Sequence, residues 1–423
     1  MSFRVVAPWR TPIFQWLGGD HPMMTSLLAP REGYEFLLDL PAPDAGHRAV
    51  AAAERDALVD ELAVAVPTVP REAIVQFADS RDLESQAQIV AAAPDLTLPH
   101  SMPFVYGQRP WMSHIEELMT LFAPFLWHGK TGNVDVRATP VWQLVRAMLE
   151  SDRCRAVSSH LRHSHAYIGR LFDSPTIQAK SHFIPFGIAF PPELQARIDS
   201  AQDARATRMG CTFLFTNSWG QQDESFVLRG GMETLVAFGA LVARRPDCRL
   251  ILRTQIPKMF GPEFETFVRS IPNVEIVDKR LGFAEFVELF LRADVFLIPS
   301  CGLHTVSLLQ SMACGAATIA SDAPAVDEFL TDGETGIAVK GRLGRTSWYD
   351  AWGFLNQTFE PLMRSYDAAF SANLGAAMES LADDRALRLR LSRAGRAHVA
   401  RNHSIGPWID GFGQVLDRVR AGL

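Results

Sequence analysis

The sequence predicts an α/β protein with two doubly wound parallel sheets. Short apolar runs alternate with helical patterns along the chain, and the run at 295–298 is apolar at every position, which is typical of a strand covered by helices on both faces. The β–α–β–α order implies right-handed crossovers within each sheet. A length of 423 residues is sufficient for two or three domains.

The second half of the chain shows the clearer alternation. The helix expected at 283–290 has apolar residues at i, i+3, i+4 and i+7, which places them on one face. A proline at 299 ends the apolar run before it. Strands are expected at 211–215, 249–252, 274–277, 295–298, 316–320 and 337–339, and further helices at 231–243 and 306–314.

The first half repeats this pattern with more irregularity. Strands are expected at 3–7, 34–38, 73–77 and 156–157, and Ala-rich helices at 49–65 and 81–93. The polar segment 191–209 is interpreted as a linker, and 341–370 as an excursion packed on the second domain. We therefore expect an N-terminal Rossmann-like domain (1–195), a C-terminal Rossmann-like domain (205–400), and a final helix (401–423) that crosses or packs back toward the first domain.

Composition excludes several classes of protein. The 41 Lys and Arg against 47 Asp and Glu give a net charge of −6, which argues against nucleic acid as a partner. The five cysteines form no CxxC pair, so the sequence favours a reducing cytoplasm. No apolar run is long enough to span a bilayer, and the N-terminus does not resemble a signal peptide. His160, His163 and His165 match no metal-ligand spacing, so a polar loop or helix start is favoured over a metal site.

Six arginines lie within or beside the expected helix at 385–401. Such a run is usually a solvated helix face, but a peripheral contact with an anionic membrane, at its inner face, stays open as an alternative. The following helix begins near Pro407 and carries an apolar side that includes Trp408.

The loop 299–307 is the most informative candidate for binding. It leaves a buried strand and enters a helix, so its amides end at a helix N-terminus, where free N–H groups and the helix dipole favour a phosphate. Gly302 permits close backbone approach, and Thr305 is the expected N-cap. An ordinary strand–helix turn is the alternative interpretation.

Several motifs around this loop resemble one known family. They are Ala293–Ser300, Met312-Ala313-Cys314-Gly315, Ile319–Asp322, Glu328, Asp332–Gly336 and Leu228-Arg229-Gly230-Gly231. In this order they resemble the donor half of GT-B glycosyltransferases, in particular the retaining glycosyltransferase family 4 (group 1). The resemblance covers 211–340 well, 385–420 moderately and the first 200 residues weakly. It implies a GT-B fold, with two Rossmann-like domains facing a cleft and a C-terminal helix packing back toward the first.

The chain departs from that family at charged positions. The usual E-x7-E pair corresponds to Gly302 and Gln310, and the usual Lys-Gly to Gly230-Gly231. The resemblance therefore indicates a divergent subset in which Arg229 replaces the phosphate-binding lysine and His304 replaces the missing acid. An amide at Gln310 still bonds ribose hydroxyls.

The resemblance also implies the remaining site residues. Catalytic roles are expected for Glu116, Arg229 and His304. The donor would contact Gly18, Gly19, Asn217, Arg229, Arg253, Arg280, Gly302, Leu303, His304, Thr305, Val306 and Gln310, and the acceptor His100, His114 and Glu116. No metal is expected, because the sequence lacks an Asp-x-Asp motif, and no cofactor apart from the nucleotide-sugar donor substrate.

The expected activity is transfer of a sugar from a nucleoside-diphosphate sugar to a hydroxyl of a glycan or glycolipid acceptor, with retention. Polysaccharide or glycolipid assembly in the cytoplasm is the setting that family habit implies. Two alternatives stay open. One is another GT-B enzyme, such as a nucleotide-sugar epimerase or hydrolase, and the other is a non-catalytic sugar-nucleotide-binding protein, which the lost carboxylate and lysine would explain.

Overall fold

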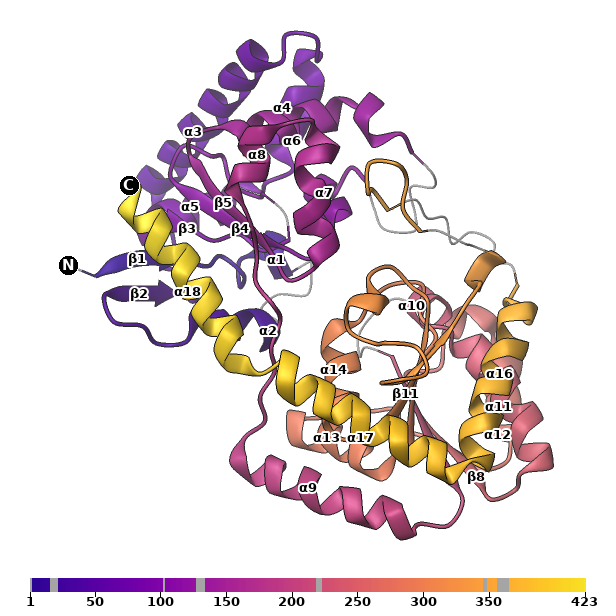
Figure 1. Cartoon of the computed structure of the whole chain (residues 1–423). Helices are drawn as coiled ribbons and strands as arrows, with labels where there is room; N and C mark the ends of the chain where they lie inside the picture. Colours follow the sequence, from indigo (N-terminus) through magenta and orange to yellow (C-terminus); the bar gives the residue numbers. More distant parts are fainter. Residues whose placement is uncertain are drawn as a thin grey trace. The chain divides into compact units, whose positions relative to one another are not determined.

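The computed structural model describes residues 2–15, 22–101, 103–126, 134–217, 223–344, 348–355 and 365–423. The chain forms two compact units (Figure 1). Unit 1 comprises Met1–Phe186, Tyr349–Thr358 and Gly406–Leu423, and unit 2 comprises Gly187–Trp348 and Phe359–Ile405. Each unit contains a six-stranded parallel sheet, as the alternating sequence pattern predicts.

The sheet of unit 1 has the strand order β2-β1-β3-β4-β5-β6. Its switch point, where the chain changes its direction of winding, lies between β1 and β3. The strands are β1 (Phe3–Val6), β2 (Tyr34–Leu37), β3 (Leu96–Thr97), β4 (Trp111–Ile115), β5 (Cys154–Ser159) and β6 (Ser181–Phe183). The helices are α1 (Pro12–Gln15), α2 (Pro22–Thr25), α3 (Ala45–Ala65), α4 (Arg71–Asp79), α5 (Leu83–Ala92), α6 (Pro140–Glu150), α7 (Arg162–Phe172), α8 (Pro175–Lys180) and α18 (Ile405–Ala421).

One strand predicted in unit 1 is wrong. Residues 73–77 lie inside α4, because Ile74, Phe77 and Ala78 are buried at the i, i+3, i+4 spacing of an amphipathic helix. A short apolar run can form a buried strand or part of a buried helix, so the local pattern does not decide between strand and helix.

The C-terminal helix α18 completes unit 1. Trp408 is fully buried and packs edge-on against His114 and Phe186, with ring centroids 5.2 Å away in each case. Its indole N–H donates to the Ser26 hydroxyl at 2.9 Å. The last helix of the chain is therefore part of the core of the first unit.

The excursion was predicted to pack on the second domain, and for residues 349–355 this is wrong. They belong to unit 1, where the Phe354 ring packs edge-on against Phe122 at 5.6 Å and His163 Nε2 lies 2.8 Å from the Gly353 carbonyl. Aromatic residues predict burial but do not identify the partner surface.

The sheet of unit 2 has the order β12-β11-β10-β7-β8-β9, with its switch point between β10 and β7. The strands are β7 (Cys211–Thr216), β8 (Cys248–Arg253), β9 (Val274–Ile276), β10 (Val295–Ile298), β11 (Ala317–Ser321) and β12 (Ile337–Val339). The helices are α9 (Pro192–Thr207), α10 (Glu224–Leu228), α11 (Gly231–Arg244), α12 (Pro262–Ser270), α13 (Phe283–Arg292), α14 (Thr305–Ala313), α16 (Ala368–Asp383) and α17 (Arg385–Asn402).

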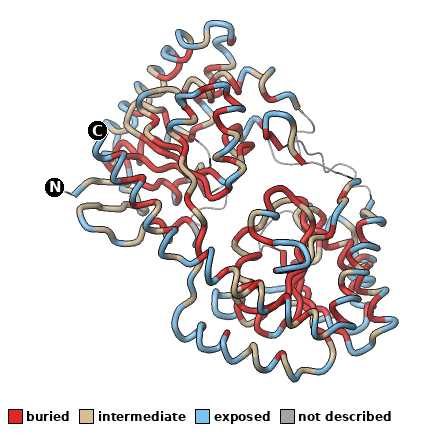
Figure 2. The backbone as a smooth tube through the Cα atoms, in the orientation of Figure 1, coloured by how far each residue is buried: buried red, intermediate tan, exposed pale blue. Residues whose placement is uncertain are grey.

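Alternate residues of these strands build the core of unit 2. Phe213 and Leu250 pack in one apolar cluster with Phe238 of α11 and Leu374 of α16. Figure 2 shows the central strands of both sheets as buried, whereas the edge strands β2 and β9 are only partly buried. Burial on both faces explains why the strands read as continuous apolar runs in the sequence.

The predicted linker is a helix. Within 191–209, α9 begins at Pro192 and ends at Thr207, and its Arg205 is buried. The Arg205 guanidinium donates to the carbonyls of Ala293, Cys314 and Phe290 at 2.7–2.8 Å. These carbonyls lie at the ends of α13 and α14, where helices leave C=O groups without intrahelical partners. One buried cation therefore fixes a segment whose polarity suggested a loop.

The arginines of α17 form internal contacts. Arg388 is buried and donates to the Leu381 carbonyl, Arg390 donates to the Gly333 carbonyl at 3.1 Å, and Arg396 pairs with Asp199. A purely solvated face does not describe this helix, and membrane contact stays a prediction. Across the described ranges, no helix combines the length and apolarity needed to cross a bilayer.

Candidate active site

A small pocket lies at the carboxyl edge of the unit 2 sheet, at its switch point. It is lined by Phe215 and Thr216 of β7, Leu297 and Ile298 of β10, and the side chains of Arg229, His304 and Ser307. Ligands of open α/β sheets bind at such a point, beyond the carboxyl ends of the strands. The fold thus brings together Arg229 and His304, which are 75 positions apart in the sequence.

Arg229 is held by the turn between α10 and α11. The Arg229 amide donates to the Ser225 carbonyl at 3.0 Å, and Gly230 follows with φ of +81°. A Cβ atom at Gly230 would lie 2.4 Å from the Pro299 carbonyl oxygen. Only glycine fits this turn, because it combines a left-handed backbone with direct contact to the end of β10.

A buried ion pair lies behind this turn. Arg342 Nη2 is 3.5 Å from Glu233 Oε2, both side chains are fully buried, and Arg342 also donates to the Val227 carbonyl at 3.2 Å. The Val227 carbonyl accepts the Gly230 amide as well, at 2.9 Å. Sequence reasoning missed this pair. The signal was a glutamate two residues after Gly231 in an otherwise apolar helix face.

Arg253 supplies a second guanidinium at the same edge. It ends β8, is 7% exposed, and donates to the Asn217 carbonyl. Burial, together with repulsion from Arg253, lowers the pKa of Arg229 to about 10. Two cations that repel each other in a protein's interior are stabilised by an anion placed between or beside them.

The loop after β10 is ordered by its own side chains. Ser300 Oγ lies 2.8 Å from His304 Nε2 and accepts the Gly302 amide at 3.2 Å. The helix α14 begins at Thr305 with His304 as its N-cap residue, so the expectation that Thr305 is the N-cap is wrong. The His304 side chain makes no capping hydrogen bond and instead reaches back to Ser300.

The other predicted donor residues occupy varied positions. Asn217 is buried after β7, accepts from the Ser225 hydroxyl at 2.9 Å, and donates to Thr254 at 3.4 Å. Arg280 is exposed beyond β9. Leu303, Val306 and Gln310 are partly exposed on the loop and on α14, and Gly18 and Gly19 lie outside the described residues.

In unit 1, the predicted acceptor residues lie at the carboxyl edge of β3 and β4. Glu116 follows β4 and is exposed, and its backbone carbonyl accepts from Ser159 at 3.2 Å and from Ser164 at 2.9 Å. His100 follows β3 and forms an isolated parallel β-bridge with His114. Its ring packs edge-on against Trp9, with ring centroids 6.1 Å apart.

His114 is fully buried. Its ring contacts Ser158 at 3.0 Å, His160 at 3.1 Å and the face of α18 at Trp408. Burial lowers the pKa of His114 well below its usual value, so it is neutral at pH 7. Its predicted acceptor contact stays a prediction.

Glu117, next to Glu116, was missed by sequence reasoning. It caps the turn that follows β4 by accepting the Met119 amide at 3.1 Å. Burial raises the pKa of Glu117 to about 7, although hydrogen bonds from Met119 and Tyr349 oppose this shift. A carboxyl group that titrates near neutral pH at a sheet edge is suited to proton transfer.

The three histidines considered for a metal have separate partners. His160 packs on His114, His163 stacks on Tyr349 with centroids 3.6 Å apart, and His165 Nδ1 lies 2.9 Å from the Ser181 hydroxyl. No group of three or more metal-ligating side chains occurs within the residues that the structure describes.

With this geometry in place, comparisons with known proteins become informative. Residues 229–355 match the family model described as glycosyl transferases group 1. A glycosyltransferase from Rickettsia africae is 10% identical over 100% of both chains, with a TM-score of 0.52. Anabaena HepE in complex with UDP is 10% identical over 99% of this chain and 100% of its own, with a TM-score of 0.55.

The chain has the GT-B fold. Sucrose-phosphate synthase from Thermosynechococcus elongatus is also similar, at 16% identity over 84% of this chain and 81% of its own, with a TM-score of 0.56. No curated protein matches the chain significantly. The predicted GT-B fold and the predicted resemblance to group 1 glycosyltransferases are confirmed, the latter over residues 229–355.

Proposed function

We propose that this GT-B protein transfers a sugar from a nucleoside-diphosphate sugar to an acceptor hydroxyl. The observation that carries the proposal is the convergence of Arg229 and His304 at the unit 2 switch point. The group 1 family match begins at Arg229 itself and covers the whole loop after β10. Unit 2 then binds the donor, and unit 1 binds a glycan or glycolipid acceptor.

The chemistry of the pocket suits a departing diphosphate. As the bond to the sugar breaks, negative charge grows on the leaving phosphate, and fixed cations and amides stabilise that charge more than they stabilise the ground state. Arg229, the amides of 302–306 and the His304 ring supply these groups in the proposal. The neutralising charge comes from arginine, so the proposed reaction does not depend on a metal ion.

The finer features of the proposal rest on the resemblance and on the neighbours. HepE has been solved with UDP and with UDP-glucose, which supports a nucleotide-sugar donor here. Retention of the anomeric configuration follows the resemblance to the retaining family, and assembly of surface polysaccharide or glycolipid is the proposed setting. Glu116 is the proposed group that orients or deprotonates the acceptor hydroxyl.

The experiment that tests the proposal begins with a thermal-shift panel of nucleoside diphosphates and their sugars. A ligand at about 100 times its dissociation constant stabilises the folded state by ~2.7 kcal/mol. The stabilising donor is then incubated with candidate acceptors, and mass spectrometry and NMR of the product report transfer and anomeric configuration. Arg269→Ala, an exposed arginine on α12, serves as the matched control for Arg229→Ala.

The outcomes separate the three functions. Formation of a glycosylated acceptor supports the proposal, whereas release of free sugar or a changed sugar configuration without acceptor indicates a hydrolase or an epimerase. Binding of the donor with no turnover indicates a sugar-nucleotide-binding protein. If no nucleotide binds, all three functions are contradicted.

A further inference from the structure

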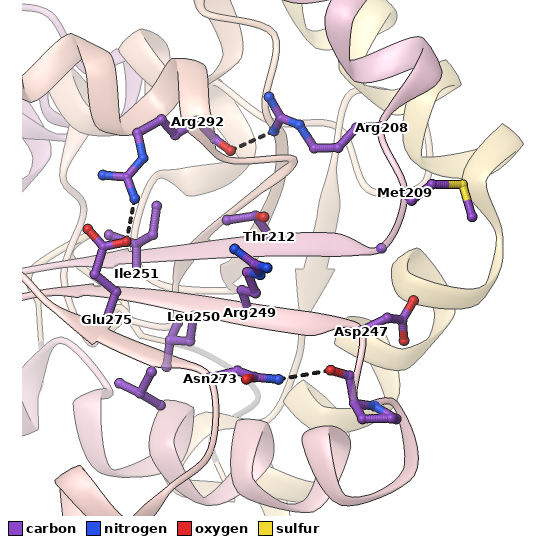
Figure 3. Close-up of a pocket in the computed structure, with 13 residues that line it drawn as sticks. Arg208, Met209, Thr212, Asp247, Arg249, Leu250, Ile251, Asn273, Glu275 and Arg292 are labelled. Atoms are coloured by element: carbon purple, nitrogen blue, oxygen red, sulfur yellow. Dashed lines mark hydrogen bonds and ion pairs between the residues drawn. The ribbon is translucent and has the colours of Figure 1, made fainter.

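A second cavity lies at the opposite edge of the unit 2 sheet, where β7, β8 and β9 begin (Figure 3). Its volume is about 750 Å³, within the range of small-molecule sites. The six residues of β7 separate the two edges by roughly 20 Å at ~3.3 Å per residue. The amino-edge cavity is therefore distinct from the candidate donor pocket.

Among the described residues that line this cavity, one charged side chain has no partner of opposite charge. Arg292 pairs with Glu275, Asp247 pairs with Arg245 at 3.1 Å, and Arg208 lies 3.3 Å from Asp294. Arg249 also lines the cavity and is exposed, and its guanidinium makes no hydrogen bond or ion pair to any residue that the structure describes. An unmatched cation in a cavity attracts an anion.

The position of Arg249 in the sheet is unusual for this fold. Arg249 is the second residue of β8, opposite Thr212 of β7, and the next residue on the same face is Ile251, opposite Glu275 of β9. Strands of doubly wound sheets are covered by helices on both faces. This face of β8 is covered at Ile251, which is 2% exposed, but Arg249 nearer the amino edge is exposed. In Figure 3, Arg249 lies between Thr212 and Asn273.

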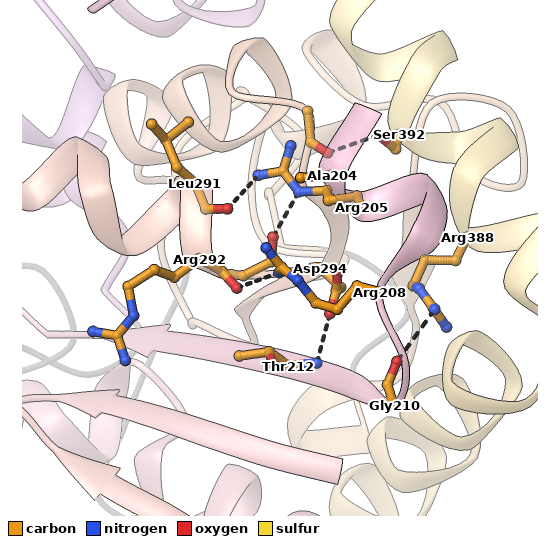
Figure 4. A network of polar contacts seen from close by, with 12 residues as sticks. Ala204, Arg205, Arg208, Gly210, Thr212, Leu291, Arg292, Asp294, Arg388 and Ser392 are labelled. Carbon is orange, nitrogen blue, oxygen red and sulfur yellow. Dashed lines mark hydrogen bonds and ion pairs between the residues drawn. The ribbon is translucent and has the colours of Figure 1, made fainter. Parts of the chain in front are cut away.

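Arg208 is held in a fixed position beside the cavity (Figure 4). Its Nη1 donates to the Arg292 carbonyl and contacts Asp294, while Asp294 is 3% exposed and accepts the Thr212 amide at 2.8 Å. Both contacts that Arg208 makes through its guanidinium to described residues use Nη1, and its Nε and Nη2 groups make none to that part of the chain. A cation that is already immobilised loses less conformational entropy on binding than a free surface side chain does.

We propose that the amino-edge cavity binds a small anionic metabolite, with Arg249 and Arg208 holding its carboxylate or phosphate group. A guanidinium donates through a planar fork that matches both of these anions. Thr212 and Asn273 provide polar surface for hydroxyl groups of the same ligand. Glu275 and Asp247 limit the excess of positive charge, which favours a single anionic group over a polyanion.

Isothermal titration calorimetry tests the site with inorganic phosphate, glucose 6-phosphate and glucuronate, and with glucose as the uncharged probe. Arg249→Gln is expected to weaken the binding of the anions by roughly tenfold or more. Arg208→Gln should weaken it as well, whereas Arg269→Gln, on the exposed face of α12, should leave it unchanged. Binding of glucose 6-phosphate alone identifies a phosphate ligand, and binding of glucuronate alone identifies a carboxylate ligand.

The donor pocket also attracts phosphate, so the same titrations are repeated with Arg229→Ala and with added UDP. Binding at the amino edge should persist in Arg229→Ala, and Arg249→Gln should retain its affinity for UDP. The proposal is overturned if none of the anions binds, or if Arg229→Ala abolishes their binding while Arg249→Gln does not. Neither result depends on whether the protein transfers a sugar.

Discussion

At the scale of the residue, the candidate active site depends on a few charged side chains with perturbed surroundings. Arg229 and Arg253 repel each other at the edge of unit 2, and Glu116 and Glu117 follow β4 in unit 1. The charge of either glutamate can be removed with little change in volume by substitution with Gln. The residue scale therefore supplies three predictions that separate donor binding, turnover and stability.

Arg229→Ala should weaken the binding of a nucleoside diphosphate by ~1.5–3 kcal/mol, the usual contribution of a charge-assisted hydrogen bond. Calorimetry with UDP measures the change, and Arg269→Ala provides the control on an exposed helix face. Equal affinity of the Arg229→Ala and wild-type proteins would remove Arg229 from the site.

Glu116→Gln should lower turnover and leave nucleotide affinity intact. The amide cannot accept a proton from the acceptor hydroxyl, but the exposed side chain does not support the fold. The test is kcat with saturating donor, together with the dissociation constant for UDP. Glu72→Gln, on the exposed side of α4, is the control. Unchanged turnover would contradict the role of Glu116.

Glu117 should make stability depend on pH. Burial raises its pKa to about 7, above the value of ~4.3 for an unfolded glutamate. The folded state therefore binds this proton more tightly than the unfolded state does. The resulting contribution to the free energy of unfolding is full below pH ~4.3 and is lost as the pH rises through about 7. Gln does not titrate, so the free energy of unfolding of Glu117→Gln minus that of the wild type should increase as the pH rises from 4 to 8.

Urea unfolding at a series of pH values measures this difference, because the other titrating groups cancel between the two proteins. The control Glu72→Gln should give a difference that does not vary with pH. A flat difference for Glu117→Gln would show that the carboxyl group is not destabilised when it ionises.

At the scale of the element, α9 shows how one side chain fixes a helix. Its composition is polar, and the residue that docks it is itself charged. Arg205→Met should lower the free energy of unfolding by about 3 kcal/mol or more, because buried carbonyls of Ala293, Cys314 and Phe290 lose their donor.

Chemical denaturation measures this loss, and Arg197→Met on the same helix is the control. Arg197 is half exposed and pairs with Glu288, so its removal should cost less than about 1 kcal/mol. Similar losses for the two variants would show that the contacts of Arg205 contribute no more than a surface ion pair.

At the scale of the whole molecule, each unit is completed by residues that are distant in sequence. Unit 1 gains 349–355 and α18, both of which follow the strands of unit 2 along the chain. Trp408→Ala should destabilise the protein by ~3–5 kcal/mol, because it leaves a cavity against His114 and Phe186. Guanidinium unfolding measures the effect, with the exposed Leu423→Ala as control, and a loss below 1 kcal/mol would mean that α18 is dispensable for the core.

Local sequence patterns predicted most elements of the fold. All six strands of unit 2 lie where the apolar runs place them, because the central strands are buried on both faces and need continuous apolar sequence. The motifs around 293–336 also predicted the family match and the GT-B fold. The pattern failed at 73–77, where the apolar run was short, and at 191–209, where the segment was polar. Both segments are helices, because packing against other elements decided their structure.

By itself, the sequence determined the alternation of strands and helices, the two-sheet architecture and the charged residues available for a site. Only the tertiary structure decided which of those charges meet. Arg229 approaches Arg253 because the turn between α10 and α11 packs on the end of β10, at the edge of the sheet where β8 also ends. The Arg249 guanidinium is left unmatched because no described residue reaches it. Periodicity records whether a residue is buried, whereas its partner depends on contacts between segments far apart in the chain, which no local pattern encodes.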